Sequence, residues 1–295
     1  MRHRTRNAAL AAVALIALGG GYYGLSAGGG EGDAAGGGPS PAERAAALDL
    51  TLPLDAYRLD HAAESEVRRA RDLLIRDCME QAGFEWYVST EASADIDPAR
   101  RRYGVIDPGV AERYGYHLPP DPRSAEVERV RSETLAEPGA EAAYFGPAES
   151  EEGCVTSADE RIARGAGEAD HALFTDLDFG SLDRSDLHPD VVAAKEDWRE
   201  CMSARGHSYD TPRDAAGDEA WDLDAPEATE AERAVAAADV ACKHEVGLVE
   251  TWVRAETDIQ RDMVAEHAAE LERVGAANAT YLENARAVLA ELGGG

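Results

Sequence analysis

The fold is decided by the stretch Cys201-Met202-Ser203-Ala204-Arg205-Gly206-His207-Ser208-Tyr209, which repeats the form of an earlier stretch, Cys78-Met79-Glu80-Gln81-Ala82-Gly83-Phe84-Glu85-Trp86. Each stretch reads Cys-Met, three residues, glycine, one residue and then an aromatic residue. A helical pattern runs up to each cysteine, and the glycine five residues later suits a helix end, where a left-handed residue is needed. The repeat predicts a mainly α protein made of two related helical halves, residues 42–183 and 184–295.

The chain has four cysteines, and one later cysteine follows each Cys-Met stretch: Cys154 follows the first and Cys242 the second. No two cysteines are closer than 41 residues, so the chain has no Cys-x-x-Cys clip of the kind that binds zinc. Four cysteines allow three disulfide connectivities, and spacing alone does not choose among them. The repeat favours Cys78 with Cys154 and Cys201 with Cys242, so that each half is closed by its own disulfide.

Residues 1–27 have the pattern of an export segment. Three arginines among the first six residues precede an uncharged, largely apolar run that ends at Ala27. This run fits either a cleaved signal peptide or an uncleaved membrane anchor, and both remain open. Residues 28–41 are rich in Gly, Ala, Ser and Pro, which predicts a flexible linker. We therefore expect the rest of the chain outside the cytoplasmic membrane, secreted or anchored, where disulfides form.

The protein is strongly acidic. Its formal net charge is −29, and leaving out the three arginines of residues 1–30, a segment without acids, brings the charge to −32. A surface this negative repels phosphate backbones and anionic headgroups. We therefore expect no nucleic-acid partner, and membrane contact only through the N-terminal segment.

Apolar spacing and turn residues place several helices. Asp60 can cap one helix, and Pro189 suits the first turn of another. Leucines alternate over residues 48–54, which favours an extended arm packed across helices, because no second clear strand offers a partner. The helices expected before the C-terminal stretch span residues 61–82, 124–135, 147–164 and 189–205.

Residues 228–292 form the longest regular stretch. They contain no proline, and their apolar residues recur at mixed three- and four-residue steps. This pattern predicts one very long helix, or two helices with a break near Gly275. Glu256 and Gln260 interrupt the apolar seam, which disfavours a dimeric coiled coil. We expect a helix that packs on its own body and leaves its far end free.

One loop between the expected helices gathers basic and aromatic residues, and it is the best candidate for a ligand site. Such a cluster on an acidic body can hold an anionic or sugar-like ligand. The alternative is that the tyrosines cover a core edge while the arginines pair with neighbouring carboxylates. We call these residues the basic aromatic loop: Arg100, Arg101, Arg102, Tyr103, Tyr114, Tyr116 and His117.

Motifs of known catalytic chemistry are missing or incomplete. Asp176-Leu177-Asp178-Phe179-Gly180 resembles the start of a calcium loop, but Leu187 stands where the closing glutamate belongs. The chain has no Gly-rich phosphate loop, dinucleotide motif or histidine cluster. We therefore expect no metal and no cofactor, and no catalytic residue can be named.

Several further motifs accompany the two Cys-Met stretches: Leu52-Pro53-Leu54-Asp55-Ala56-Tyr57, Arg102-Tyr103-Gly104-Val105, Tyr114-Gly115-Tyr116 and Ala238-Asp239-Val240-Ala241-Cys242-Lys243. With these motifs the chain resembles a group of uncharacterised exported proteins, often lipoproteins, of high-GC actinobacteria. The resemblance covers nearly all of the chain after the export segment but implies no activity. The lipid-bearing cysteine of such lipoproteins is absent here, because the first cysteine is Cys78.

Two functions remain open on the sequence. The first is a non-enzymatic accessory or binding protein at the cell surface, whose partner is a protein or a cell-envelope ligand. The second is a secreted hydrolase that acts on cell-wall or peptide material through carboxylates. A cleft with two facing acids would favour the hydrolase.

Overall fold

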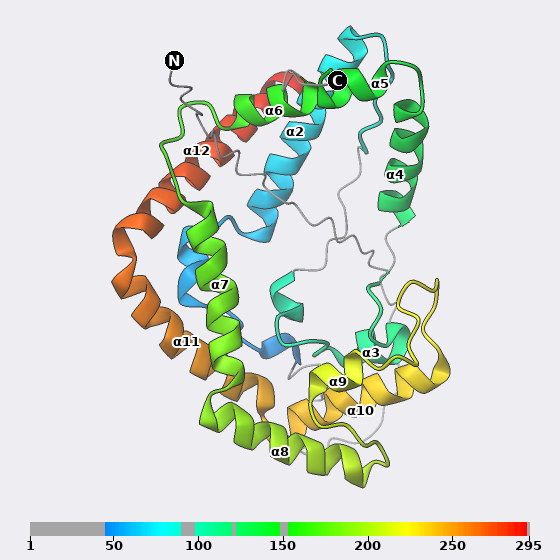
Figure 1. Ribbon diagram of the computed structural model, residues 1–295, viewed down its shortest axis with the longest axis vertical. Coiled ribbons are helices and arrows are strands. Elements are labelled where there is room, and N and C mark those ends of the chain that lie inside the picture. The colour runs from blue at the N-terminus through cyan, green and yellow to red at the C-terminus, as the bar shows by residue number, and fades with distance from the viewer. Residues whose placement is uncertain (1–44, 90–97, 120–121, 148–152, 294–295) are drawn as a thin grey trace, which may run out of the picture.

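The computed structural model describes residues 45–89, 98–119, 122–147 and 153–293, which form helices and no strand (Figure 1). The mainly α prediction is therefore confirmed. The export segment and the linker lie outside the described residues. The elements are η1 (Pro53–Tyr57), α2 (His61–Gln81), η2 (Pro98–Arg101), α3 (Pro108–Tyr114), α4 (Pro122–Leu135), α5 (Ala140–Phe145), α6 (Cys154–Ile162), α7 (His171–Asp186), α8 (Pro189–Ala204), α9 (Pro212–Ala216), α10 (Glu230–Val246), α11 (Leu248–Glu266) and α12 (Ala268–Leu292).

The two Cys-Met stretches end their helices in the same way. Gly83 after α2 and Gly206 after α8 have positive φ angles of 93° and 84°. In each turn the backbone N–H of the next residue donates to the carbonyl of the methionine, at 2.9 Å after α2 and 3.0 Å after α8. This is the glycine-ended turn that satisfies the last carbonyls of a helix. Met79 and Met202 are both fully buried.

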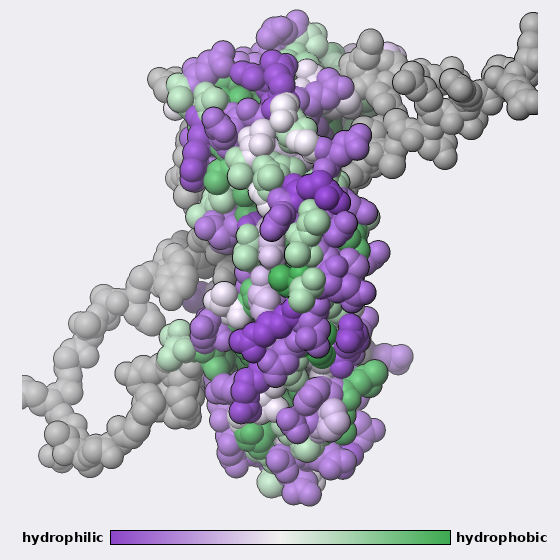
Figure 2. All heavy atoms as spheres, turned by 90° about the vertical axis from the view of Figure 1, so that its left-hand side faces the viewer, coloured by the Kyte–Doolittle hydropathy of each residue, from purple (hydrophilic) through white to green (hydrophobic). Residues whose placement is uncertain are grey.

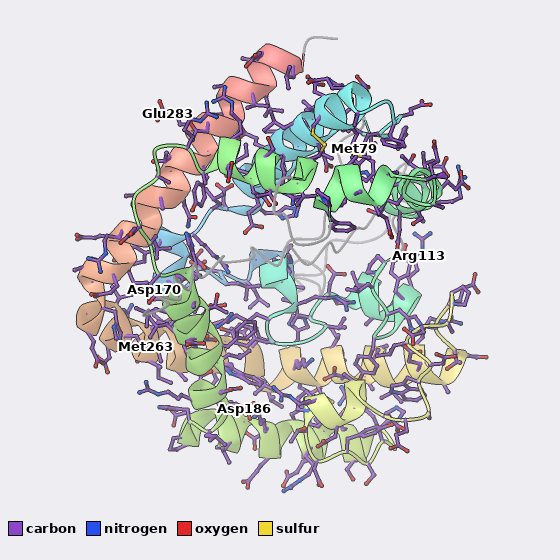
Figure 3. All side chains as sticks on the ribbon, turned by 45° about the horizontal axis from the view of Figure 1, so that its top comes forward. Met79, Arg113, Asp170, Asp186, Met263 and Glu283 are labelled. Atoms are coloured by element: carbon purple, nitrogen blue, oxygen red, sulfur yellow. A yellow bond between two sulfur atoms is a disulfide. The ribbon has the colours of Figure 1, made fainter. Side chains whose placement is uncertain are left out.

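The disulfides pair as the repeat predicts. Cys78 bonds to Cys154 and Cys201 to Cys242, with Cα–Cα distances of 5.6 Å and 5.7 Å. The first disulfide joins the end of α2 to the start of α6, where Figure 3 shows it as a yellow bond beside Met79. The second joins the last turn of α8 to α10.

The C-terminal stretch differs from the prediction. It forms three helices rather than one or two, with breaks at Gly247 and His267, and Gly275 lies inside α12. Gly247 ends α10 because it adopts a left-handed conformation, with φ 64° and ψ 33°. Gly275 instead continues the helix beside η1, where a Cβ would make an ordinary contact with the Cα of Tyr57 at 3.7 Å. The far end of α12 is not free either, because it packs on α2 and α6.

The boundaries of other helices also differ from the predicted ones. The helix expected over residues 147–164 is described only from Cys154, and Gly146 ends a separate short helix, α5. The calcium-like residues Asp176–Gly180 lie within α7, a 16-residue helix that the sequence analysis did not predict. Helical backbone cannot wrap around a cation as a calcium loop does. Leu52 and Leu54 are buried before α2, but Leu54 belongs to the 3-10 helix η1, so the extended arm expected over residues 48–54 stops before Pro53.

Segments from each predicted half pack against the other half. In Figure 1, α10, α11 and α12 follow one another along the lower edge and up the left side, so that α12 ends beside α2. In the opposite direction, Tyr103, Val105 and Tyr116 pack into the hydrophobic cluster of α8 and α10. The boundary expected between residues 183 and 184 falls inside α7, and the division into two domains stays a prediction. No helix within the described ranges has the length and apolar character needed to cross a membrane.

Candidate functional site

The centre of the basic aromatic loop is buried against α7 and α11. Arg102 Nε lies 3.0 Å from Glu256 Oε1, and Arg102 Nη2 donates to the backbone carbonyl of Asp178 at 2.7 Å. Tyr103 donates its hydroxyl to Glu256 Oε2 at 2.7 Å. The Glu256 side chain is fully buried, and that of Arg102 is 11% exposed. We call this arrangement the Glu256 junction.

Two α7 and α11 side chains complete the Glu256 junction. Ser181 Oγ lies 2.7 Å from Glu256 Oε1 and accepts from Gln260 Nε2 at 2.9 Å. Gln260 Oε1 in turn accepts the backbone N–H of Leu54 at 3.0 Å. The junction therefore connects η1, the loop, α7 and α11, and its buried polar atoms have partners, as burial requires.

Charge and burial shift the pKa values of two side chains of the Glu256 junction, Arg102 and Tyr103. Burial alone would lower the pKa of Arg102, but hydrogen bonding to Glu256 and the charges of Asp178 and Glu256 raise it above its ordinary value. Burial, and then the charge of Glu256, raises the pKa of Tyr103. Arg102 is therefore held as a cation and Tyr103 as a neutral donor, so neither side chain can release a proton near neutral pH.

A second buried arrangement, the Asp239 junction, lies under the same loop. Asp239 on α10 accepts from Lys243 Nζ at 2.9 Å, from Trp198 Nε1 at 3.0 Å and more distantly from the Tyr116 hydroxyl at 3.4 Å. Lys243 also donates to the carbonyl of Val105 at 3.0 Å. Burial raises the pKa of Asp239, although Lys243 and Trp198 act against the shift. The Asp239 side chain is fully buried, so a substrate cannot reach it.

Glu232, in the first turn of α10, holds the end of the loop. Its Oε1 accepts the Tyr116 backbone N–H at 2.8 Å and lies 2.9 Å from His117 Nδ1. A Cβ on Gly115 would lie 2.5 Å from the same oxygen, so glycine is needed for this close approach. Arg101 donates to the carbonyls of Tyr116 and His117 at 3.2 Å and 2.7 Å, and burial lowers the pKa of Arg101.

The two remaining loop residues lie at its edges. Arg100 donates to the carbonyl of Ala45 at 2.6 Å. Tyr114 is half-buried, with the guanidinium of Arg113 5.2 Å from its ring centroid. The structure thus brings Arg102 and Tyr103 together at Glu256, and Tyr116 and His117 together at Glu232, but does not gather all seven residues around one opening. Their role in binding a ligand stays a prediction.

Two surface cavities lie away from the loop. The first, of about 220 Å³, is lined by Asp186, Lys195, Trp252 and residues 211–214. In it, the ammonium of Lys195 pairs with Asp186 and lies 4.5 Å from the centroid of the Trp252 ring. Figure 3 labels Asp186 at the end of α7 that faces α8. The second cavity, of about 600 Å³, is an open groove between α8 and residues 207–210. Neither cavity includes a residue of the Glu256 or Asp239 junction.

Sequence reasoning missed the partners of the loop. Glu256 and Gln260 stood out only as interruptions of the apolar seam of α11, and they occupy buried positions one helical turn apart. Asp239 and Lys243 show the same four-residue spacing on α10, and Lys243 is one of only two lysines in the chain. Polar residues on the apolar face of a helix were therefore the available signal.

Within the described residues, no group of three or more His, Cys, Asp or Glu side chains is placed to hold a metal ion. Comparison of the chain with protein-family models, curated proteins and solved structures finds no match.

Proposed function

We propose that the chain is an extracytoplasmic, non-enzymatic accessory or binding protein that presents a disulfide-bonded helical domain to a protein or cell-envelope ligand. The proposal rests on the observation that the central side chains of the basic aromatic loop contact buried residues of the same chain rather than an open site. Its central arginine and tyrosines contact Glu256, Asp239 and Glu232, three carboxylates that are fully buried. The most chemically promising residues therefore stabilise the domain, and binding is left to its outer faces.

Charge indicates the kind of partner. Hydrophilic side chains cover most of the face drawn in Figure 2, and the chain has 58 acidic residues against 29 lysines and arginines. Charge complementarity favours a partner with basic groups, and it makes the association rate sensitive to salt. Two disulfides agree with a location outside the cytoplasmic membrane, because such bonds persist in oxidising compartments.

The experiment is carboxyl-directed crosslinking of the full-length tagged protein in intact cells of its host. Amine-directed reagents suit this chain poorly, because both of its lysines, Lys195 and Lys243, are buried and paired with carboxylates. We expect one recurring, salt-sensitive crosslinked partner from the envelope. A protein that is protected from external protease in intact cells, or that yields no partner above an untagged control, would refute the proposal.

Enzymatic activity is tested with the same purified protein on cell-wall and peptide substrates. The proposal predicts no turnover above that of heat-unfolded protein. Turnover that is lost when a carboxylate lining either surface cavity is replaced would instead support the hydrolase hypothesis.

A further inference from the structure

His117 has a hydrogen-bond acceptor at each of its ring nitrogens. Nδ1 lies 2.9 Å from Glu232 Oε1, and Nε2 lies 3.1 Å from the backbone carbonyl oxygen of Asp222. A neutral imidazole has one donor and one acceptor nitrogen, so it can satisfy only one of these contacts. In the other contact, two lone pairs would face each other. Only the imidazolium form donates to both oxygens.

The surroundings of Glu232 favour the same protonation state. Its side chain is fully buried, and Oε2 has no hydrogen-bond partner. A buried carboxylate needs a nearby positive charge. Glu232 is the third residue of α10, where the helix dipole stabilises a negative charge, and its own N–H is capped by Thr229 at 3.1 Å. A carboxylate at this position is therefore matched by a cation at His117.

We infer that His117 carries a proton on both ring nitrogens and so helps to fasten the α9–α10 loop, residues 217–229, to α10, by donating at once to the Asp222 carbonyl and to Glu232. The groups that face His117 are the Glu232 carboxylate from α10 and the Asp222 carbonyl from the α9–α10 loop. The Arg101 guanidinium binds the His117 carbonyl from η2. Asp239 contacts the hydroxyl of Tyr116, the residue before His117, at 3.4 Å.

The consequence for the loop follows from the geometry. Both hydrogen bonds and the ion pair with Glu232 exist only while both ring nitrogens carry protons. A side chain with a single donor would keep one of the two contacts, so this link between α10 and the α9–α10 loop would weaken.

Nitrogen NMR of the full-length protein tests the protonation state directly, with His244 as an internal control. His244 Nε2 faces a single acceptor, the carbonyl of Ile106 at 2.8 Å, so one protonated nitrogen satisfies it. At neutral pH we expect protons on both ring nitrogens of His117, whereas the contact of His244 requires a proton on Nε2 only. A single protonated nitrogen on His117 at neutral pH would overturn the inference.

Two variants test the consequence. With Glu232→Gln, which removes the counter-charge, His117 should lose its second proton at neutral pH. With His117→Gln, amide exchange across residues 217–229 should rise about tenfold relative to wild type, as expected for the loss of a charged hydrogen bond. A His244→Gln control should leave exchange in this loop unchanged. Unchanged exchange in His117→Gln, or equal increases in both histidine variants, would also overturn the inference.

Discussion

Replacing Glu256 with glutamine is the sharpest perturbation of the domain, because it removes one charge from a fully buried site and keeps the side-chain shape. The carboxylate lies between the Arg102 guanidinium, the Tyr103 hydroxyl and the Ser181 hydroxyl. Glutamine offers one acceptor oxygen and one NH₂ group, so at least one of these donors would face another donor. Arg102 would keep only Asp178 as a counter-charge.

The expected cost follows from the burial of the pair. Removing one partner of a buried ion pair destabilises a protein by about 3–5 kcal/mol, because the other charge stays buried without compensation. Asp178 still compensates part of the charge of Arg102, so we expect the lower end, about 3 kcal/mol. For a chain of this size, that corresponds to a fall in melting temperature of roughly 6–12 °C.

Chemical denaturation of wild type and Glu256→Gln measures this difference, and Arg261→Gln on the same helix is the matched control. Arg261 pairs with Asp258, and the two side chains are 67% and 75% exposed. Exposed pairs contribute about 0–1 kcal/mol, so the control should lie close to wild type. If Glu256→Gln and Arg261→Gln changed the free energy of unfolding equally, the Glu256 junction would not hold the loop as we describe.

Three further predictions concern other parts of the domain. Gly115→Ala should destabilise the protein by about 2 kcal/mol or more in thermal denaturation, because φ is 58° and the new Cβ would meet Glu232. The control is Gly165→Ala, where φ is 80° but the space around the residue is open, and it should cost about 1 kcal/mol. Because the pKa of Tyr103 is raised by burial and the Glu256 charge, the stability that depends on its protonated form is complete below the ordinary tyrosine pKa of about 10 and is lost as pH rises above it. Tyr103→Phe should therefore reduce the alkaline slope of unfolding free energy against pH by about 1.4 kcal/mol per pH unit, and an unchanged slope would contradict this. An amine-acylating reagent should leave Lys243 unmodified in the native protein and modify it after unfolding, as peptide mass analysis would show. Modification of Lys243 in the native protein would place it at the surface.

Local turn chemistry made part of the fold predictable. The ends of α2 and α8 follow from a glycine at a fixed distance after Cys-Met, and each end depends only on residues within one turn. The disulfide pairing followed from the repetition of that unit. The break near Gly275 was wrong because a glycine permits the end of a helix without requiring it. Gly247 adopts the left-handed conformation that ends α10, whereas Gly275 keeps the helical conformation inside α12.

The candidate site was harder to predict because its contacts join distant parts of the chain. The sequence identified Arg102 and Tyr103 as chemically promising, but their partner Glu256 lies 154 residues after Arg102. A polar residue on the apolar face of α11 indicates that some partner exists, and only the packing of α7 and α11 shows which one it is. Periodicity likewise missed α7, since apolar and charged residues alternate irregularly along it.

Peptide mapping under non-reducing conditions, after rapid alkylation of intact cells and isolation of the full-length protein from the envelope or medium, tests the central claim of an exported domain with two separately closed helical units. Digestion with trypsin should give two linked pairs: residues 77–100 with 132–161, and residues 200–205 with 234–243. Alkylated cysteines, or a link between either of Cys78 and Cys154 and either of Cys201 and Cys242, would contradict the account.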